Sequence, residues 1–341
     1  MHLGIGGSSS AGAHLRMKSS TISSHSHITQ LGTTARSCIL QGGHGNVLAV
    51  VSQAIYLLTE SGELLWITPE NAPMHRRCVQ ILMPLPGLST GSQFRMRDHQ
   101  LEFDPSIVLD MQNASVWSTP RMQPGQLLDF TQLFSHIQSL FSLLDHSQTR
   151  GFGSFLPHIL LLSRDTTTQP LPETADPVLS FAGPLVLEMA RACLEGRSTL
   201  ISRSACALIG LGAGLTPSGD DFLGGAFFAL VILRAAYPGL FHTDIIAPID
   251  MVRSRTHLIS YTLLSDLANG YAVAPLHSVI NGILRGEPLE DIVPFIDQLT
   301  RLGHSTGWDL LAGMLTGLLI TAPGGHLIPS RKRHYLEYGK E

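Results

Sequence analysis

The pattern of apolar and polar residues changes character along the chain. From residue 35 to 118, short apolar runs alternate with turn residues, as in SQAIYLLTESGELLWIT, where two runs flank residues 60–63. Gly62 favours a hairpin turn there, because glycine tolerates positive φ. The runs CVQILM, QFRMR, HQLEF and SIVLDM follow at intervals typical of a small barrel or sandwich. We expect this β region to be a structural platform without chemistry of its own.

Beyond a linker at 118–126 (STPRMQPGQ), apolar residues recur at helical spacing. Helices are predicted over 178–196, 199–209, 217–237, 249–268, 272–285, 288–301 and 306–321. The fold class is therefore α+β, a small β barrel or sandwich followed by a larger, mainly helical domain. The predicted organisation is a disordered leader at 1–34, rich in Ser, Gly and His, a β domain at 35–118 and a helical domain at 126–330.

Composition narrows the class of protein. The chain has 341 residues, of which 44% are hydrophobic and 14% charged, so it can bury a sizeable core and a subunit interface. A net charge of −4 gives no basic footprint for nucleic acid. The N-terminus has no apolar signal region, and runs such as FFALVIL are shorter than the ~20 residues of a membrane span. Four widely spaced cysteines predict reduced, buried thiols, and we expect a cytoplasmic protein.

The stretch GLGAGLTPSGDDFLGG (210–225) predicts a helix start with a binding loop in front of it. Thr216 is a candidate N-cap and Pro217 suits the first helical position. Asp220 and Asp221 then fall in the first turn, where the helix dipole favours acids. Three glycines precede the cap: Gly210, Gly212 and Gly214. They let successive amides point into one concavity, a site for phosphate or carboxylate, although a tight loop whose acids only cap the helix remains the alternative.

Two further features of this stretch bear on its function. Its spacing fits neither a P-loop nor a dinucleotide-binding fingerprint. Gly224 and Gly225 each cost roughly 0.5–1 kcal/mol in a helix interior relative to alanine. Another helix or a ligand must therefore come close to this first turn.

A second copy of the motif lies near the C-terminus. TGWDLLAG (306–313) repeats SGDDFLGG (218–225), pairing Ser218 with Thr306 and Asp221 with Asp309 at a constant spacing, 309 − 221 = 88. Thr306 and Asp309 also fit a capping box. We interpret the copies as related helix starts that pack through small residues and direct both N-termini toward one cavity. Chance similarity, or a shared capping habit alone, is the alternative.

Two carboxylates beside two positive helix ends would suit a ligand with an anionic group and an N–H donor. The predicted catalytic residues are Asp221, Asp309 and His304, at the amide end of the ligand. The predicted substrate-binding residues are Gly210, Gly212, Gly214, Thr216, Ser218, Asp220, Arg255, Ser260, Ser305 and Thr306. We expect no metal site or cofactor, and Mg²⁺ on Asp220 and Asp221 is the weaker alternative.

These motifs, together with SYTLLSDLANGYAVAPLHSVI and LLTESGELL, resemble a small bacterial family of unknown function. The family includes a subunit of oxamate carbamoyltransferase from anaerobic allantoin degradation, a branch of purine catabolism, and the similarity spans roughly residues 40 to 322. The resemblance implies a complex that interconverts oxalurate plus phosphate with oxamate plus carbamoyl phosphate. It marks Gly210, Gly212, Gly214, Thr216, Pro217, Ser218, Asp220, Asp221, Ser260, Gly270, Gly303, His304, Gly307 and Asp309.

One position departs from the pattern of the family. Some members carry a basic residue in the glycine loop where this chain has Leu211. A phosphate here would then depend on amides, hydroxyls and Arg203 or Arg255.

Two hypotheses of function follow. In the first, the chain is a carbamoyltransferase-type subunit that binds carbamoyl phosphate, oxamate or a similar small anion. The carbamoyl group would then be transferred by direct displacement, because no Ser-His-Asp or Cys-His spacing for a covalent nucleophile is present. In the second, it is a non-catalytic partner subunit that binds a small metabolite. Both imply a hetero-complex with other subunits, and neither implies nucleic acid or membrane as a partner.

Overall fold

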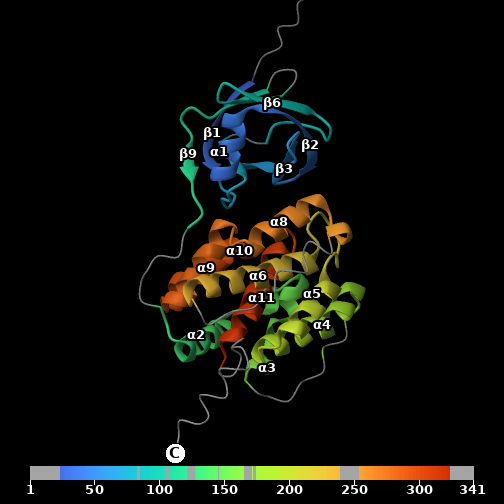
Figure 1. The fold of residues 1–341 in the computed structure, drawn as a ribbon, viewed down its shortest axis with the longest axis vertical. Coiled ribbons are helices and arrows are strands. Elements are labelled where there is room, and N and C mark those ends of the chain that lie inside the picture. The colour runs from blue at the N-terminus through green and yellow to red at the C-terminus, as the bar shows by residue number, and fades with distance from the viewer. Residues whose placement is uncertain are drawn as a thin grey trace, which may run out of the picture.

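The fold has two parts, a β barrel and a helical region (Figure 1). Residues 121–126 of the predicted linker at 118–126 lie outside the described residues. The computed structural model describes residues 24–82, 85–103, 107–120, 127–144, 146–164, 171, 174–238 and 253–322. The barrel precedes the helices along the chain, which confirms the predicted α+β class. In Figure 1 the helix α8 lies on the side of the helical region that faces the barrel, whereas α2 and α3 lie on the far side.

Nine strands form the barrel sheet. They are β1 (Ser24–Gly32), β2 (Gly43–Val51), β3 (Ala54–Thr59), β4 (Leu64–Pro69), β5 (Cys78–Ile81), β6 (Gln93–Arg97), β7 (Gln100–Phe103), β8 (Ile107–Asp110) and β9 (Ser115–Trp117). Their order is β5-β4-β3-β2-β6-β7-β8-β1-β9, and the pairing of β1 with β5 closes eight of them into a barrel. Since a closed barrel has no free edges, only β9 remains as an addition beside β1.

The hairpin predicted around residues 60–63 is confirmed. Strands β3 and β4 pair antiparallel, with Ile55 opposite Ile67, and Gly62 has φ +84°. The helix α1 (Thr33–Gln41), which the sequence did not predict, covers the barrel with Ala35, Cys38 and Ile39 in the barrel core.

The predicted leader at 1–34 is wrong from residue 24 onward, because β1 and the start of α1 occupy that segment. The strand reads SHSHITQLG, and its many polar residues do not give the apolar pattern from which a strand is predicted. It pairs with β5, β8 and β9, so contacts with distant strands rather than local preference hold it in the sheet. Residues 1–23 of the predicted leader lie outside the described residues.

The helical region contains helices in each of the predicted ranges and, before them, α2 and α3. They are α2 (Phe130–Leu143), α3 (Leu156–Ser163), α4 (Pro177–Leu194), α5 (Ser198–Leu208), α6 (Ser218–Ala236), α8 (Leu258–Ala268), α9 (Ala274–Arg285), α10 (Leu289–Thr300) and α11 (Thr306–Leu318), with the short 3₁₀ turns η1 (His146–Gln148), η2 (Gly151–Phe155), η3 (Arg253–Arg255) and η4 (Leu319–Thr321). Within the described part of the helix predicted over 249–268, α8 begins at Leu258 after the turn η3, and residues 249–252 lie outside the described residues. Just before it, Thr256 donates a hydrogen bond to Asp220, which holds this segment as a loop.

Helix α4 is the one described helix long and apolar enough to cross a membrane by length and composition. Its residues Ala182, Val186, Met189 and Cys193 belong to the core of the helical region. The same test is passed by core helices of globular proteins.

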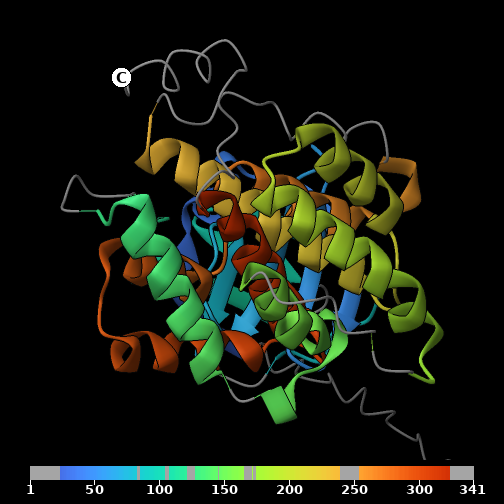
Figure 2. The ribbon, with the colours of Figure 1, turned by 90° about the horizontal axis from the view of Figure 1, so that it is seen from below.

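Helices α6 and α11 cross at their small residues, and α11 lies in the middle of the helices seen from below in Figure 2. A Cβ added to Gly225 would overlap the carbonyl oxygen of Leu310, and one added to Gly313 would overlap that of Phe222. Gly224 lies against Leu267 of α8. The close approach predicted from the glycines is therefore made by two other helices.

Candidate functional site

A pocket of about 390 Å³ lies between the barrel and the helical region, and we call it the interdomain pocket. The barrel contributes Tyr56, Trp66 and His75 to its lining. The helical region contributes residues at the starts of α6 and α11 and from the segment between α8 and α9: Leu215, Thr216, Asp221, Leu263, Leu267, Tyr271, Ala272, Val273, Leu302, Gly303, Thr306 and Leu310. The two helix starts that share a sequence motif thus meet at one cavity.

Asp221 is the acidic residue of this pocket. It lies in the first turn of α6, with only 5% of the residue exposed, and its Oδ2 atom has no hydrogen-bond partner among the described residues. Burial raises the pKa of Asp221 well above its usual range, and the nearby charge of Asp309 raises it further, while the hydroxyls of Thr306 and Thr216 lower it. Burial therefore outweighs the helix dipole, which alone would favour the carboxylate.

Asp309 is fully buried in the first turn of α11 and does not line the pocket. Its Oδ1 atom accepts a hydrogen bond from the backbone N–H of Phe152 at 2.6 Å, and its Oδ2 atom has no partner in the described part of the chain. Burial raises the pKa of Asp309 to about 7, against the opposing hydrogen bonds from Phe152, Ser218 and Ser305. The two predicted catalytic aspartates therefore differ, since one faces the pocket and the other faces the turn η2.

The raised pKa of Asp309 predicts how stability depends on pH. The folded state keeps a proton that the unfolded chain releases from pH 4 upward, so the stability contributed by this group is full below about pH 4 and lost as the pH rises through about 7. A shift from 3.8 to about 7 corresponds to roughly 4 kcal/mol.

Asp309→Asn keeps an acceptor for the Phe152 N–H and cannot ionise. In urea unfolding, we expect the variant to gain stability relative to the parent between about pH 5 and pH 8. An equal difference in free energy of unfolding at both pH values would contradict the assignment.

Asp220 does not face the pocket. It accepts hydrogen bonds from the Gly210 N–H at 2.7 Å, from the Ser260 hydroxyl at 2.6 Å and from the Thr256 hydroxyl. These bonds fix the glycine loop to the start of α8. The side chains of Asp220 and Ser260 and the N–H of Gly210 are thus used within the fold, and contact of these residues with substrate stays a prediction.

The predicted caps are also wrong. The N-cap of α6 is Pro217 and that of α11 is Ser305, and neither helix has a side-chain cap. Instead Thr216 and Thr306 place their hydroxyls 3.3 Å apart, across the two helix starts. A capping threonine would be occupied by its own helix, whereas these two hydroxyls lie in the lining of the pocket.

The other predicted site residues surround the pocket without lining it. Ser218 and Ser305 place their hydroxyls 3.3 Å apart, beside Asp309. His304 is exposed. Arg255 is exposed and donates to the Cys206 carbonyl at 2.5 Å, which removes it from the pocket. Gly212 and Gly214 have the positive φ values expected of the loop, +122° and +95°, but also lie outside the lining.

The barrel residues of the site were missed by the sequence reasoning, which assigned that domain no chemistry. His75 stacks on Trp66 with ring centroids 4.9 Å apart. Burial, then the charges of Arg77 and Arg76, lowers the pKa of His75 to about 3, so the ring is neutral. Burial and the charge of Asp221 raise the pKa of Tyr56 to about 12. The aromatic wall is therefore uncharged at neutral pH.

Buried ion pairs hold this wall against the helices. Arg77 donates from Nε to Asp266 Oδ2 at 2.5 Å and from Nη2 to Oδ1 at 3.1 Å. The guanidinium of Arg76 lies 3.9 Å from the centroid of the Tyr271 ring. The run MHRRC (74–78), polar inside an apolar region, was the available signal for these contacts.

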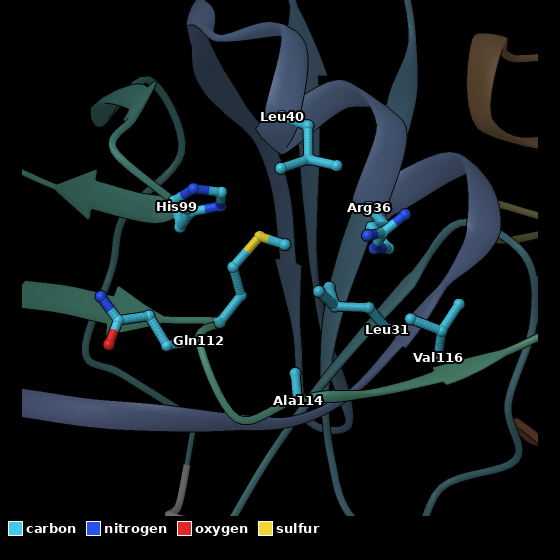
Figure 3. A pocket seen from close by; sticks show the side chains of 8 residues that line it. Leu31, Arg36, Leu40, His99, Gln112, Ala114 and Val116 are labelled. Carbon is cyan, nitrogen blue, oxygen red and sulfur yellow. The ribbon is translucent and has the colours of Figure 1, made fainter.

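A second pocket, of about 430 Å³, lies on the barrel (Figure 3). Arg36 and Leu40 of α1 line it, and His99 stands on the side opposite Arg36. These residues are exposed, and none of the predicted site residues lies there. The interdomain pocket is the better candidate, because it combines a buried acid with the repeated helix starts.

The polar residues that line the interdomain pocket can support hydrogen bonding and proton transfer. The residues that the structure describes in its lining include no Lys or Arg. The described chain also has no group of three or more His, Cys, Asp or Glu side chains placed to hold a metal ion. Asp220 and Asp221 do not fit a Mg²⁺ site, since Asp220 already accepts three hydrogen bonds.

A comparison with known protein families matches the part of the chain that forms the helical side of the interdomain pocket. Residues 208–318 match the family model described as oxamate carbamoyltransferase subunit AllH. The matched segment includes both helix starts, with Asp221 and Asp309. No solved structure matches the chain. Over residues 208–318, the chain is therefore similar to the oxamate carbamoyltransferase subunit AllH.

Proposed function

We propose that the chain is the subunit of a carbamoyltransferase-type enzyme that holds the amide-bearing substrate in the interdomain pocket. The observation that carries this proposal is the unpartnered Oδ2 atom of Asp221, buried at the start of α6 and part of the pocket lining. A buried polar atom without a partner is costly unless a ligand supplies one.

The reaction needs a group of this kind. The amide nitrogen of oxamate forms a bond to the carbamoyl carbon of carbamoyl phosphate, and the C–O bond to phosphate breaks with its electron pair. The nitrogen loses one proton, which Asp221 accepts and passes to the departing phosphate. A carboxylate with a raised pKa suits this task, because general bases are most effective when their pKa lies near the working pH.

The phosphate end requires help from outside the lining. Two helix N-termini contribute about half a positive charge each, but no described lining residue is a cation. We therefore propose that another subunit supplies the cationic groups. The alternative is a metabolite-binding subunit without catalytic groups. Its ligand would bind in the same pocket, but Asp221 would only bind the ligand and would not accept a proton from it.

Reconstitution tests the function. The purified chain is assayed alone and with the other subunits of the complex for oxamate-dependent release of phosphate from carbamoyl phosphate. We expect turnover only in the mixture. Turnover by the other subunits without this chain would contradict the proposal, and so would a full complex that releases phosphate at the same rate with and without oxamate.

A further inference from the structure

The starts of α6 and α11 are related by a local two-fold arrangement. Gly225 lies against the carbonyl of Leu310, and Gly313 lies against that of Phe222. These contacts are reciprocal, because 313 − 225 = 88 and 310 − 222 = 88. Reciprocal contacts of this kind are the signature of a self-complementary, two-fold interface.

The surroundings of the two aspartates follow the same relation. Asp221 has a hydroxyl from its own loop, that of Thr216, and one from the opposite helix start, that of Thr306. Asp309 has the hydroxyl of Ser305 from its own loop and that of Ser218 from the opposite start. Ser218 and Thr306 are again 88 residues apart, 306 − 218 = 88.

The arrangement differs in what faces each carboxyl group. At Asp309 the chain's own turn η2 fills the space, and the backbone N–H of Phe152 donates to Oδ1 at 2.6 Å. Gly151 packs against the same carboxyl group. At Asp221 no backbone amide of the described residues donates in this way, and the interdomain pocket lies there instead. The N–H that Phe152 donates to Asp309 therefore indicates the kind of donor that a ligand would supply to Asp221.

We propose that Asp221 is a specificity-determining residue that accepts the N–H of a planar amide on the substrate, as Asp309 accepts the N–H of Phe152. This inference rests on the proposed function for the place of the substrate and adds a basis for its selectivity, the choice of an amide over a carboxylate. Asp309, whose Oδ1 atom already accepts the Phe152 N–H, is then a positioning residue.

Such a site discriminates between an amide and a carboxylate of the same size. Oxamate offers an N–H, whereas oxalate places a second negative oxygen at the same position. Sites built around a buried hydrogen-bonding group reject analogues that cannot make the bond, because the protein group is left unpaired. The aromatic wall of Tyr56, Trp66 and His75 carries no positive charge that would balance a second carboxylate.

The test is isothermal titration of oxamate and of oxalate into the full chain assembled with its other subunits, at about pH 8, where more of Asp221 is ionised. The parent is compared with Asp221→Asn and with a control, Asp291→Asn, which alters an exposed acid in the first turn of α10. We expect oxamate to bind at least about 10-fold more tightly than oxalate to the parent and the control, and the two ligands to bind within about 2-fold in Asp221→Asn.

The outcomes separate the inference from the proposed function. Equal binding of the two ligands by the parent, or a preference for oxamate that survives in Asp221→Asn, would overturn the inference while oxamate-dependent turnover kept the function intact. A complex that binds neither ligand and shows no turnover would overturn both.

Discussion

Gly313→Ala is expected to destabilise the chain by about 1–3 kcal/mol or more. The new Cβ would overlap the Phe222 carbonyl oxygen, and its nearest atoms are backbone, which cannot rotate away as a side chain does. The axes of α6 and α11 would have to separate. Because both helices carry a buried aspartate at their start, the separation would also disturb the pocket.

The reciprocal contact gives this prediction its controls. Gly225→Ala, which meets the Leu310 carbonyl, should have a similar effect. Gly87→Ala, where nothing lies within 4 Å of the added atom, should change the free energy of unfolding by less than about 0.5 kcal/mol. Urea unfolding of the three variants measures this directly, and a Gly313→Ala protein as stable as Gly87→Ala would show that the helices do not cross as described.

Much of the helical region could be predicted from the sequence, because its signals are local. Helical spacing identified α6 and α11, and glycines inside a helix indicated that another helix or a ligand approaches, which the structure resolves in favour of helices. The repeat at a spacing of 88 residues indicated that the two starts are related. Strand β1 could not be found in this way, since its pairing with β5, β8 and β9 depends on residues far along the chain.

The site was predicted less completely, for the same reason. Asp220 and Asp221 are neighbours in one helical turn, and only the loop before α8 decides which of them is used within the fold. The partner of Asp309 is 157 residues away, at Phe152. The aromatic wall comes from the barrel, and the sequence of its strands contains no motif that predicts a ligand-binding site. Local signals identified the helix starts, whereas the choice of residues that face the pocket depends on packing between the two parts.

Asp221→Asn is expected to lower turnover by roughly 10²–10⁴-fold, the usual contribution of a general base. Asparagine has nearly the same shape but cannot take a proton. Its folding should not suffer, because burial already disfavours the ionised form of Asp221 in the folded state. The neighbouring change Asp220→Asn should behave in the opposite way and lower stability, since that carboxyl group accepts hydrogen bonds from Gly210, Thr256 and Ser260.

The most direct test of the account is the rate at which the reconstituted complex releases phosphate from carbamoyl phosphate in the presence of oxamate, with Asp221→Asn in place of the parent chain. Asp291→Asn, an exposed first-turn acid, serves as the control. The account predicts a complex that assembles and unfolds like the parent but is at least about 100-fold slower, with the control unaffected. An Asp221→Asn complex that turns over at the parental rate would contradict it.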